Sequence, residues 1–284
     1  MTDAVALGLG AAACWGVADF LGGIQTRRIP GVVVAAGSQA VALCLLAAAV
    51  VPFTGIDGDR EGTLIALVAG VATAGGVAAL YAALALGPMT VVAAITATGV
   101  TVPILFGLAT GERPTALEGL GMALAGIGVL LAAQDRPLTE ELRRASRRAL
   151  VLSLLAAALL GIDLVALERS ANEGNAVSTV FWNRLSSVVL LGVAVAVLQR
   201  GIVTRLRERP QITLAIGAGD VGGIGLFTLA TTVGLLGIVA LVSSLYPVIT
   251  IALAYLLLGE RVRPIQRLGV VTVLVGVGLL SLGA

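Results

Sequence analysis

The sequence predicts an all-α integral membrane protein with ten transmembrane helices arranged as two inverted five-helix repeats. Composition is the first reason, because hydrophobic residues make up 58% of the 284 residues and charged residues only 12%, too few for an ordinary water-soluble surface. The second is a series of ten apolar runs, each about as long as the 20 residues that a helix needs to cross a bilayer. The third is a set of short motifs that recur at a nearly constant spacing.

The ten apolar runs follow one another with mostly short connections. We place them at 4–24, 31–53, 62–86, 88–109, 115–133, 150–168, 176–198, 211–234, 237–258 and 264–282. They must be helices, because a backbone polar group left unpaired in hydrocarbon is very costly. The first run lacks the preceding basic segment of a cleavable signal peptide, so we expect it to remain in the protein as the first helix.

Recurring residues indicate an internal duplication. The segment Gly-Glu-Arg at 259–261 lies 148 positions after the same segment at 111–113. Arg184 follows Gln39 by 145 positions in the same way, and the residue before each is polar. A nearly constant offset through most of the chain indicates a duplicated unit that has gained or lost a few residues in its loops.

The duplicated unit contains five helices. We therefore divide the chain into a first repeat at 1–134, a basic linker at 135–149 and a second repeat at 150–284. An odd number of spans makes the second copy enter the membrane from the opposite side, so the two repeats are inverted. Inverted repeats are characteristic of secondary transporters.

Arginine accounts for all eighteen basic residues, and its distribution predicts the orientation. Fourteen arginines fall in the loops on one side of the membrane and three in the loops on the other. The positive-inside rule places the arginine-rich side in the cytoplasm and both ends of the chain outside. The basic linker could also bind anionic lipid head groups, although its role in setting the topology is sufficient to explain it.

Charged residues inside the predicted spans are functional candidates by default. Asp220 is the tenth residue of the span that begins at 211, close to the midplane, and Asp163 and Arg184 lie within a turn or two of that depth. An ion pair of Arg184 with Asp220 or with Asp163 would neutralise both charges and leave a polar anchor for substrate. A purely structural ion pair is the alternative. The first half has Gln39 and Thr73 at the corresponding places, so any charge chemistry is asymmetric.

Asp19 has no basic residue within its own span. Loss of hydration disfavours the charged form of a carboxylate, which suits a residue that takes up and releases protons. We interpret Asp19 and Asp163 as candidate proton-coupling residues. The alternative for Asp19 is a structural carboxylate that is solvated or hydrogen-bonded, or that meets Arg27 or Arg28 beyond the end of the span.

Aromatic residues make up only 4% of the chain, so their positions within spans are informative. Trp15, Tyr81 and Tyr246 are candidates to line a cavity for apolar or aromatic substrates. Together with Arg184 and Asp220 they form the predicted substrate-binding set. Ordinary packing and placement at the membrane interface are the competing interpretations.

Proline and glycine mark the irregular parts of the spans. Pro247 predicts a bend whose freed carbonyls could face substrate, and we expect the fourth and ninth spans to form irregular walls of a cavity. A Gly-Glu-Arg segment follows each of these spans. Glu112 and Glu260 either belong only to the turns that end these helices, or form a gate salt bridge at each mouth of the cavity.

These features together resemble the EamA-like branch of the drug/metabolite transporter superfamily. The resemblance rests on WGVADF at 15–20, the paired Gly-Glu-Arg turns, Pro247 at thirteen residues before Glu260, and the closing segment GVVTVLVGVGLL. It covers essentially the whole chain, although Gly99 stands where Pro247 falls in the second half and Pro103 follows it by a turn. The resemblance implies a carrier of small metabolites or drugs, often an exporter, with a substrate cavity between the two repeats.

The sequence therefore predicts a secondary active or facilitative transporter that works by alternating access. Export is the expected direction, and the sequence leaves open whether transport is coupled to protons. The chain has no lysine and cannot form a P-loop, and it has no histidine or catalytic carboxylate cluster for an enzyme. A lipid or lipid-linked sugar flippase, an activity that the fold also hosts by resemblance, is the alternative, with Arg184 as its basic anchor.

The expected partners are a small-molecule substrate and the lipids of the cytoplasmic membrane. No nucleic acid, cofactor or metal is expected, and Cys14 and Cys44 are interpreted as inert packing residues within spans. A monomer is sufficient for transport because both repeats lie in one chain. The sequence does not decide between a monomer and a homodimer.

Overall fold

The computed structural model describes residues 2–56, 58–87, 89–132, 147–198 and 209–258, with short stretches between 264 and 279. The first half forms α1 (Thr2–Gln25), α2 (Gly31–Ala49), α3 (Val51–Thr54), α4 (Arg60–Leu86), α5 (Met89–Ala97), the 3-10 turn η1 (Thr98–Val100), α6 (Thr101–Ala109) and α7 (Ala116–Ala132). The second half forms α9 (Arg147–Glu173), α10 (Ala176–Leu198), α11 (Pro210–Thr231), α12 (Leu236–Ser243) and α13 (Tyr246–Leu258). Most of the predicted linker and much of the predicted span at 264–282 lie outside the described residues.

Six of the described helices are long and apolar enough to cross a membrane, namely α1, α2, α4, α9, α10 and α11. They coincide with six of the predicted spans and confirm them. Their outer faces carry aliphatic side chains, as on α4, where Leu64, Val68 and Val71 are each more than half exposed. Exposed aliphatic residues three to four positions apart form one stripe of a helix, which is a surface suited to lipid. The chain is therefore a multi-pass membrane protein.

Two of the predicted spans are each divided into two helices. The span at 88–109 breaks at η1 between α5 and α6, and the span at 237–258 breaks between α12 and α13. Pro247 is the second residue of α13, where its missing N–H removes no helical hydrogen bond. The hydroxyls of Ser243 and Ser244 donate to carbonyls three or four residues earlier, which satisfies backbone groups beside the break. The prediction of irregular fourth and ninth spans is confirmed.

Glycines at equivalent positions of the two halves make equivalent contacts. A Cβ added at Gly217 on α11 would lie 2.7 Å from the carbonyl oxygen of Ser38 on α2. A Cβ added at Gly70 on α4 would collide with the carbonyl oxygen of Asn183 on α10. Gly217 lies 147 positions after Gly70, and Asn183 lies 145 positions after Ser38. Helix α11 therefore approaches α2 as α4 approaches α10, and the repeat found in the sequence is also a repeat of tertiary contacts.

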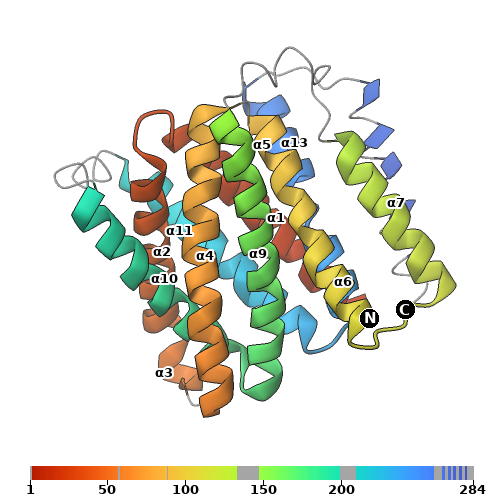
Figure 1. The fold of residues 1–284 in the computed structure, drawn as a ribbon, viewed down its shortest axis with the longest axis horizontal. Helices are drawn as coiled ribbons and strands as arrows, with labels where there is room; N and C mark the ends of the chain where they lie inside the picture. Colours follow the sequence, from red (N-terminus) through yellow and green to blue (C-terminus); the bar gives the residue numbers. More distant parts are fainter. Residues whose placement is uncertain are drawn as a thin grey trace.

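The first helix of each half packs against the other half. Helix α1 lies against α11, α12 and α13, whereas α9 lies against α4, α5, η1 and α6. Figure 1 shows α9 beside α4. Glycine again permits the approach, because Gly16 on α1 faces the carbonyl oxygen of Tyr246 and Gly161 on α9 faces that of Gly99. The two halves are therefore interlocked.

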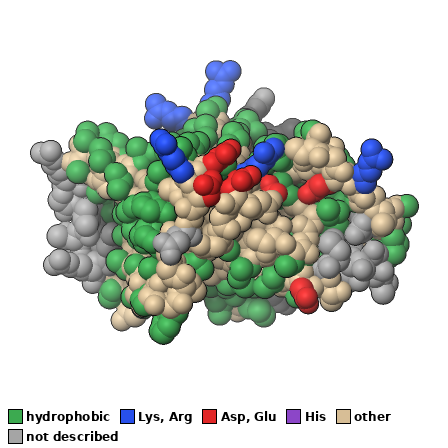
Figure 2. Space-filling view, turned by 90° about the horizontal axis from the view of Figure 1, so that it is seen from below, with side chains coloured by type: hydrophobic (Ala, Val, Ile, Leu, Met, Phe, Trp, Pro, Cys, Tyr) green, Lys and Arg blue, Asp and Glu red, His purple; other side chains and the backbone are tan. Residues whose placement is uncertain are grey.

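Charged side chains gather near the ends of the helices. Figure 2 shows the end of the molecule at which α4 begins, where acidic and arginine side chains form a group bordered by hydrophobic side chains. Asp59 caps α4 there by accepting a hydrogen bond of 3.0 Å from the backbone N–H of Glu61. The guanidinium of Arg169, near the end of α9, lies 5.1 Å from the ring centre of Phe106 on α6. Polar ends and apolar flanks are the distribution that a bilayer selects.

Glu112 joins the end of α6 to the start of α12. Its carboxylate accepts hydrogen bonds from the backbone N–H groups of Leu236 at 2.6 Å and Gly237 at 3.1 Å. These are the first two residues of α12, whose positive end favours a carboxylate. Gly111, with φ of 103°, makes the preceding turn in a conformation that favours glycine. Glu112 thus caps a helix of the other half, and it forms no salt bridge within the part of the chain that the structure describes. Glu260 lies outside the described residues.

Replacing Gly70 by alanine should lower the stability of the protein by about 1–3 kcal/mol, because the added methyl group forces α4 and α10 apart. Gly192→Ala on α10 is the matched control, since a Cβ added at Gly192 meets no atom within 4 Å. Thermal unfolding in detergent micelles, followed by circular dichroism, measures both. Equal unfolding temperatures for the two variants would contradict the close contact of α4 with α10.

Replacing Glu112 by glutamine should cost about 1–3 kcal/mol, because the two backbone donors of α12 lose a charged acceptor. Glu173→Gln is the control, because Glu173 is exposed at the end of α9 and makes no such contact. The same unfolding measurement applies. A loss of stability in the control as large as in Glu112→Gln would show that the helix cap is not the cause.

Candidate functional site

A cavity of about 110 Å³ lies between the two halves. Its wall draws on α1, α4, α5 and η1 of the first half and on α9 to α13 of the second. The polar and aromatic residues of the wall are Trp15, Asp19, Thr73, Thr96, Asp163, Arg184, Asp220, Ser243, Ser244 and Tyr246. The four charged residues that the sequence places inside spans therefore all face this cavity.

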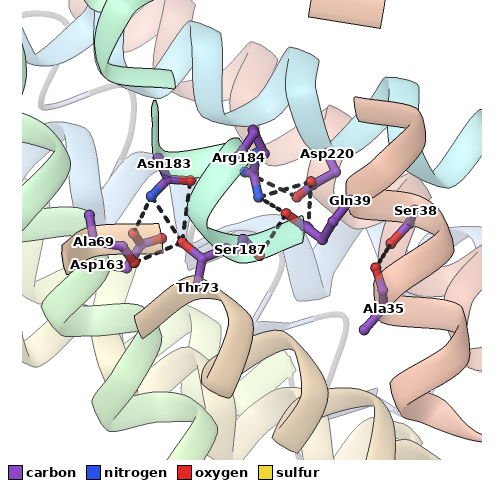
Figure 3. A network of polar contacts seen from close by, with 10 residues as sticks. All are labelled: Ala35, Ser38, Gln39, Ala69, Thr73, Asp163, Asn183, Arg184, Ser187 and Asp220. Atoms are coloured by element: carbon purple, nitrogen blue, oxygen red, sulfur yellow. Dashed lines mark hydrogen bonds and ion pairs between the residues drawn. The ribbon is translucent and has the colours of Figure 1, made fainter. Parts of the chain in front are cut away.

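Arg184 is the centre of a buried polar network, drawn in Figure 3. Its Nη1 lies 3.2 Å from Oδ2 of Asp220, and its Nη2 lies 3.5 Å from Oδ1. Nη1 also donates to Oε1 of Gln39, whose own Nε2 donates to Oδ2 of Asp220 at 2.8 Å. Arg184 is only 2% exposed, and a guanidinium buried to that degree without partners would be very costly. Of the two alternatives left open by the sequence, Asp220 is the ion-pair partner.

Asp163 belongs to a second polar group, which contains Asn183, the residue before Arg184 on α10. The amide Nδ2 of Asn183 lies 3.0 Å from Oδ1 of Asp163 and 3.0 Å from Oγ1 of Thr73. The Thr73 hydroxyl in turn donates to the carbonyl of Ala69 at 3.1 Å. Asp163 is 5% exposed and forms no ion pair within the described part of the chain. Its carboxylate accepts from the neutral amide of Asn183 and is not in direct contact with a guanidinium of the described residues.

Asp19 faces the cavity from α1. Its carboxylate makes no ion pair or hydrogen bond with any residue that the structure describes. Arg27 and Arg28 are exposed beyond the end of α1, so the proposed contact with these arginines is not formed. An intramembrane carboxylate without a protein partner is free to bind a proton or a ligand.

Two of the three predicted aromatic residues, Trp15 and Tyr246, line the cavity. The Trp15 ring is held in place by Phe227, with ring centres 5.9 Å apart. Tyr81 is not part of the wall. Its side chain is 3% exposed and packs against Gly22 of α1, so it belongs to the core between α1 and α4.

The sequence did not identify Gln39 as a partner of Arg184, although a signal was present. Gln39 and Arg184 are 145 positions apart and occupy equivalent places in the two repeats. Residues at equivalent places can contact each other when they lie at the centre of the interface between the two repeats. Thr73, the equivalent of Asp220, also belongs to the network. Thr96 was missed as well: it lines the cavity and its buried hydroxyl has no hydrogen-bond partner in the described structure. No sequence signal distinguishes Thr96 from other threonines in spans.

Family comparison matches this two-part architecture. The sequence profile of the EamA-like transporter family matches residues 3–134 and again residues 147–282. The chain belongs to the EamA-like transporter family. This family is part of the drug/metabolite transporter superfamily, so the resemblance predicted from the sequence is confirmed.

A solved structure shares the fold of this EamA-like protein. It is described as "Crystal structure of protein", and it superimposes with a TM-score of 0.77, covering 98% of this chain and 96% of that chain. The two sequences are 16% identical, so the likeness concerns the fold alone. No curated protein matches the sequence.

In this EamA-like protein, Arg184→Met should lower the stability by about 3–5 kcal/mol, because Asp220 stays buried without its cation. Adding Asp220→Asn to that variant should recover part of the loss, since no unpaired charge then remains. A double-mutant cycle measured by thermal unfolding in micelles tests this. A double variant whose loss equals the sum of the two single losses would show that the two side chains are not coupled.

Proposed function

We propose that this protein is a secondary active or facilitative transporter that moves a small metabolite or drug across the cytoplasmic membrane by alternating access. The observation that carries the proposal is the cavity shared by both halves. It contains the Arg184–Asp220 ion pair and the carboxylate of Asp19, which has no partner among the described residues. A site between two interlocked repeats can open to either side when one repeat rocks against the other. Membership of a transporter family supports the same reading.

The proposed topology is ten spans in two inverted repeats of five. Helices α5 with α6, and α12 with α13, would each cross the membrane as one broken span. Helix α7 and the predicted span at 264–282 would complete the two repeats. The equivalent contacts of Gly70 and Gly217 support the repeat, and the distribution of arginine supports termini on the outside.

We assign substrate binding to Trp15, Arg184, Asp220 and Tyr246, which combine aromatic surface with a neutralised ion pair on the cavity wall. Tyr81 would support the site only indirectly, by packing α1 against α4.

Proton coupling is assigned to Asp19 and Asp163. Both are carboxylates that face the cavity and form no ion pair within the described residues. A carboxylate away from water and from cations is the group that a proton relay inside a membrane requires.

Export from the cytoplasm is the proposed direction, following the carriers that the chain resembles. A flippase for lipids or lipid-linked sugars would hold a phosphate group with a free basic residue. The pairing of Arg184 with Asp220 and Gln39 supports a solute carrier over that alternative.

Purified protein in liposomes should accumulate members of a panel of amino acids, sugars and amphipathic amines when a pH gradient is imposed. Asp19→Asn should abolish the gradient-driven accumulation, because asparagine cannot exchange a proton. Asp3→Asn is the matched control, since Asp3 lies in the first turn of the same helix and is exposed. Uptake of labelled solutes is the measurement.

Equal accumulation by wild type and Asp19→Asn would remove the coupling role from Asp19 and transfer the test to Asp163→Asn. Movement of a fluorescent lipid between leaflets, with no movement of any solute, would reject the solute carrier and favour the flippase.

A further inference from the structure

We propose that the substrate is an organic monocation, an amine attached to an apolar and preferably aromatic body. This inference rests on the proposed transport function and specifies its substrate class. It follows from the charges that face the cavity, from an unpartnered hydroxyl in its wall, and from the aromatic residues beside them.

Acidic side chains outnumber basic ones among the described residues of the cavity wall. Three carboxylates, from Asp19, Asp163 and Asp220, face it together with the single guanidinium of Arg184 among the described lining residues. Asp220 is paired with Arg184, at 3.2 Å between Oδ2 and Nη1. Neither Asp19 nor Asp163 forms an ion pair within the described residues. Electrostatic interactions are stronger inside a protein than in bulk solvent. A ligand with a positive charge is favoured there and an anion is opposed.

The two carboxylates that form no ion pair are not equivalent. Asp163 accepts a hydrogen bond of 3.0 Å from Asn183, and this holds the carboxylate in place. Asp19 has no donor among the described residues. The ammonium group of a substrate would supply the missing donor, so Asp19 is the residue that binds it. A proton and an ammonium group are alternative cations for one carboxylate, which agrees with the coupling role assigned to Asp19.

Thr96 provides an independent indication of a polar ligand. It is 3% exposed and lines the cavity, and its Oγ1 has no hydrogen-bond partner in the described structure. Buried hydroxyls normally have a partner. A hydroxyl oxygen can accept a hydrogen bond from an ammonium group that is bound in the cavity. The Nε of Arg184 is also unpartnered, but it belongs to a guanidinium already neutralised by Asp220.

The rest of the wall suits an apolar body. Trp15 and Tyr246 present aromatic rings, and Leu80, Leu164 and Ile224 contribute aliphatic surface. Aromatic faces stabilise a nearby ammonium group as well as stacking on an aromatic substrate. An inorganic cation would make no use of these side chains.

Four ligands that share one scaffold test the inference, namely phenethylamine, phenylalanine, 3-phenylpropionate and 2-phenylethanol. They carry a positive charge, both charges, a negative charge and no charge. Binding to the purified full-length protein and uptake into liposomes should both favour phenethylamine. Asp19→Asn should weaken phenethylamine binding by about 10- to 100-fold, which is the effect expected for the loss of a charged hydrogen-bond partner. Asp19→Glu should retain most of the binding, and Asp3→Asn should retain all of it.

Each contrary outcome has a defined meaning. Preference for phenylalanine or 3-phenylpropionate, with uptake observed, would overturn the cation inference and leave the transport function standing. Phenethylamine binding that is unchanged in Asp19→Asn would overturn the assignment of Asp19. Failure of a wider panel of metabolites to move, as well as these four ligands, would reject the proposed function itself. Thermal unfolding of each variant identifies any loss of binding that is due to misfolding.

Discussion

The need to satisfy one buried guanidinium organises the centre of this molecule. Arg184 is almost fully buried, and an isolated charge at that depth would be prohibitive. Its partners come from both halves, because Gln39 lies on α2 and Asp220 on α11, while Arg184 itself lies on α10. Three helices must therefore meet at one point. Gly70 on α4 faces Asn183 on α10, and Gly217 on α11 faces Ser38 on α2. Both glycines lie within a turn or two of this point, and their lack of a side chain lets the helices approach closely enough to meet there.

Duplication has given the protein a symmetric scaffold and an asymmetric chemistry. The glycine contacts of Gly70 and Gly217 are equivalent, as are those of Gly16 and Gly161. The polar residues at equivalent positions differ. Where the second half has Arg184 and Asp220, the first has Gln39 and Thr73. The proposed alternating access requires two similar halves, and in our proposal the unequal charges make the cavity between them selective.

The irregular segments supply the cavity with polar groups that continuous apolar helices would not offer. Thr96 lies just before the break in the first half, and Ser243 and Ser244 lie at the break in the second. Helix α12 ends at this break, and its other end, the start at Leu236, is held by the Glu112 carboxylate. This cap attaches the start of α12 to the first half of the protein. A movement of α12 relative to α6 must therefore break the hydrogen bonds to Glu112. Asp19, which has no ion-pair or hydrogen-bond partner among the described residues, faces the same cavity from α1.

The sequence by itself determined the membrane class, the positions of six long spans, the internal repeat, the family and the set of charged residues that face the cavity. These are properties of local hydropathy and of spacing along the chain, and the bilayer allows few alternatives for a charge inside a span. Only the tertiary structure decided that Arg184 pairs with Asp220 and Gln39, that Asp19 has no partner among the described residues, and that Tyr81 lies in the core rather than on the cavity wall. Those outcomes depend on how each helix is rotated about its axis. Contacts between helices distant in sequence set that rotation, and hydropathy along the chain does not encode it.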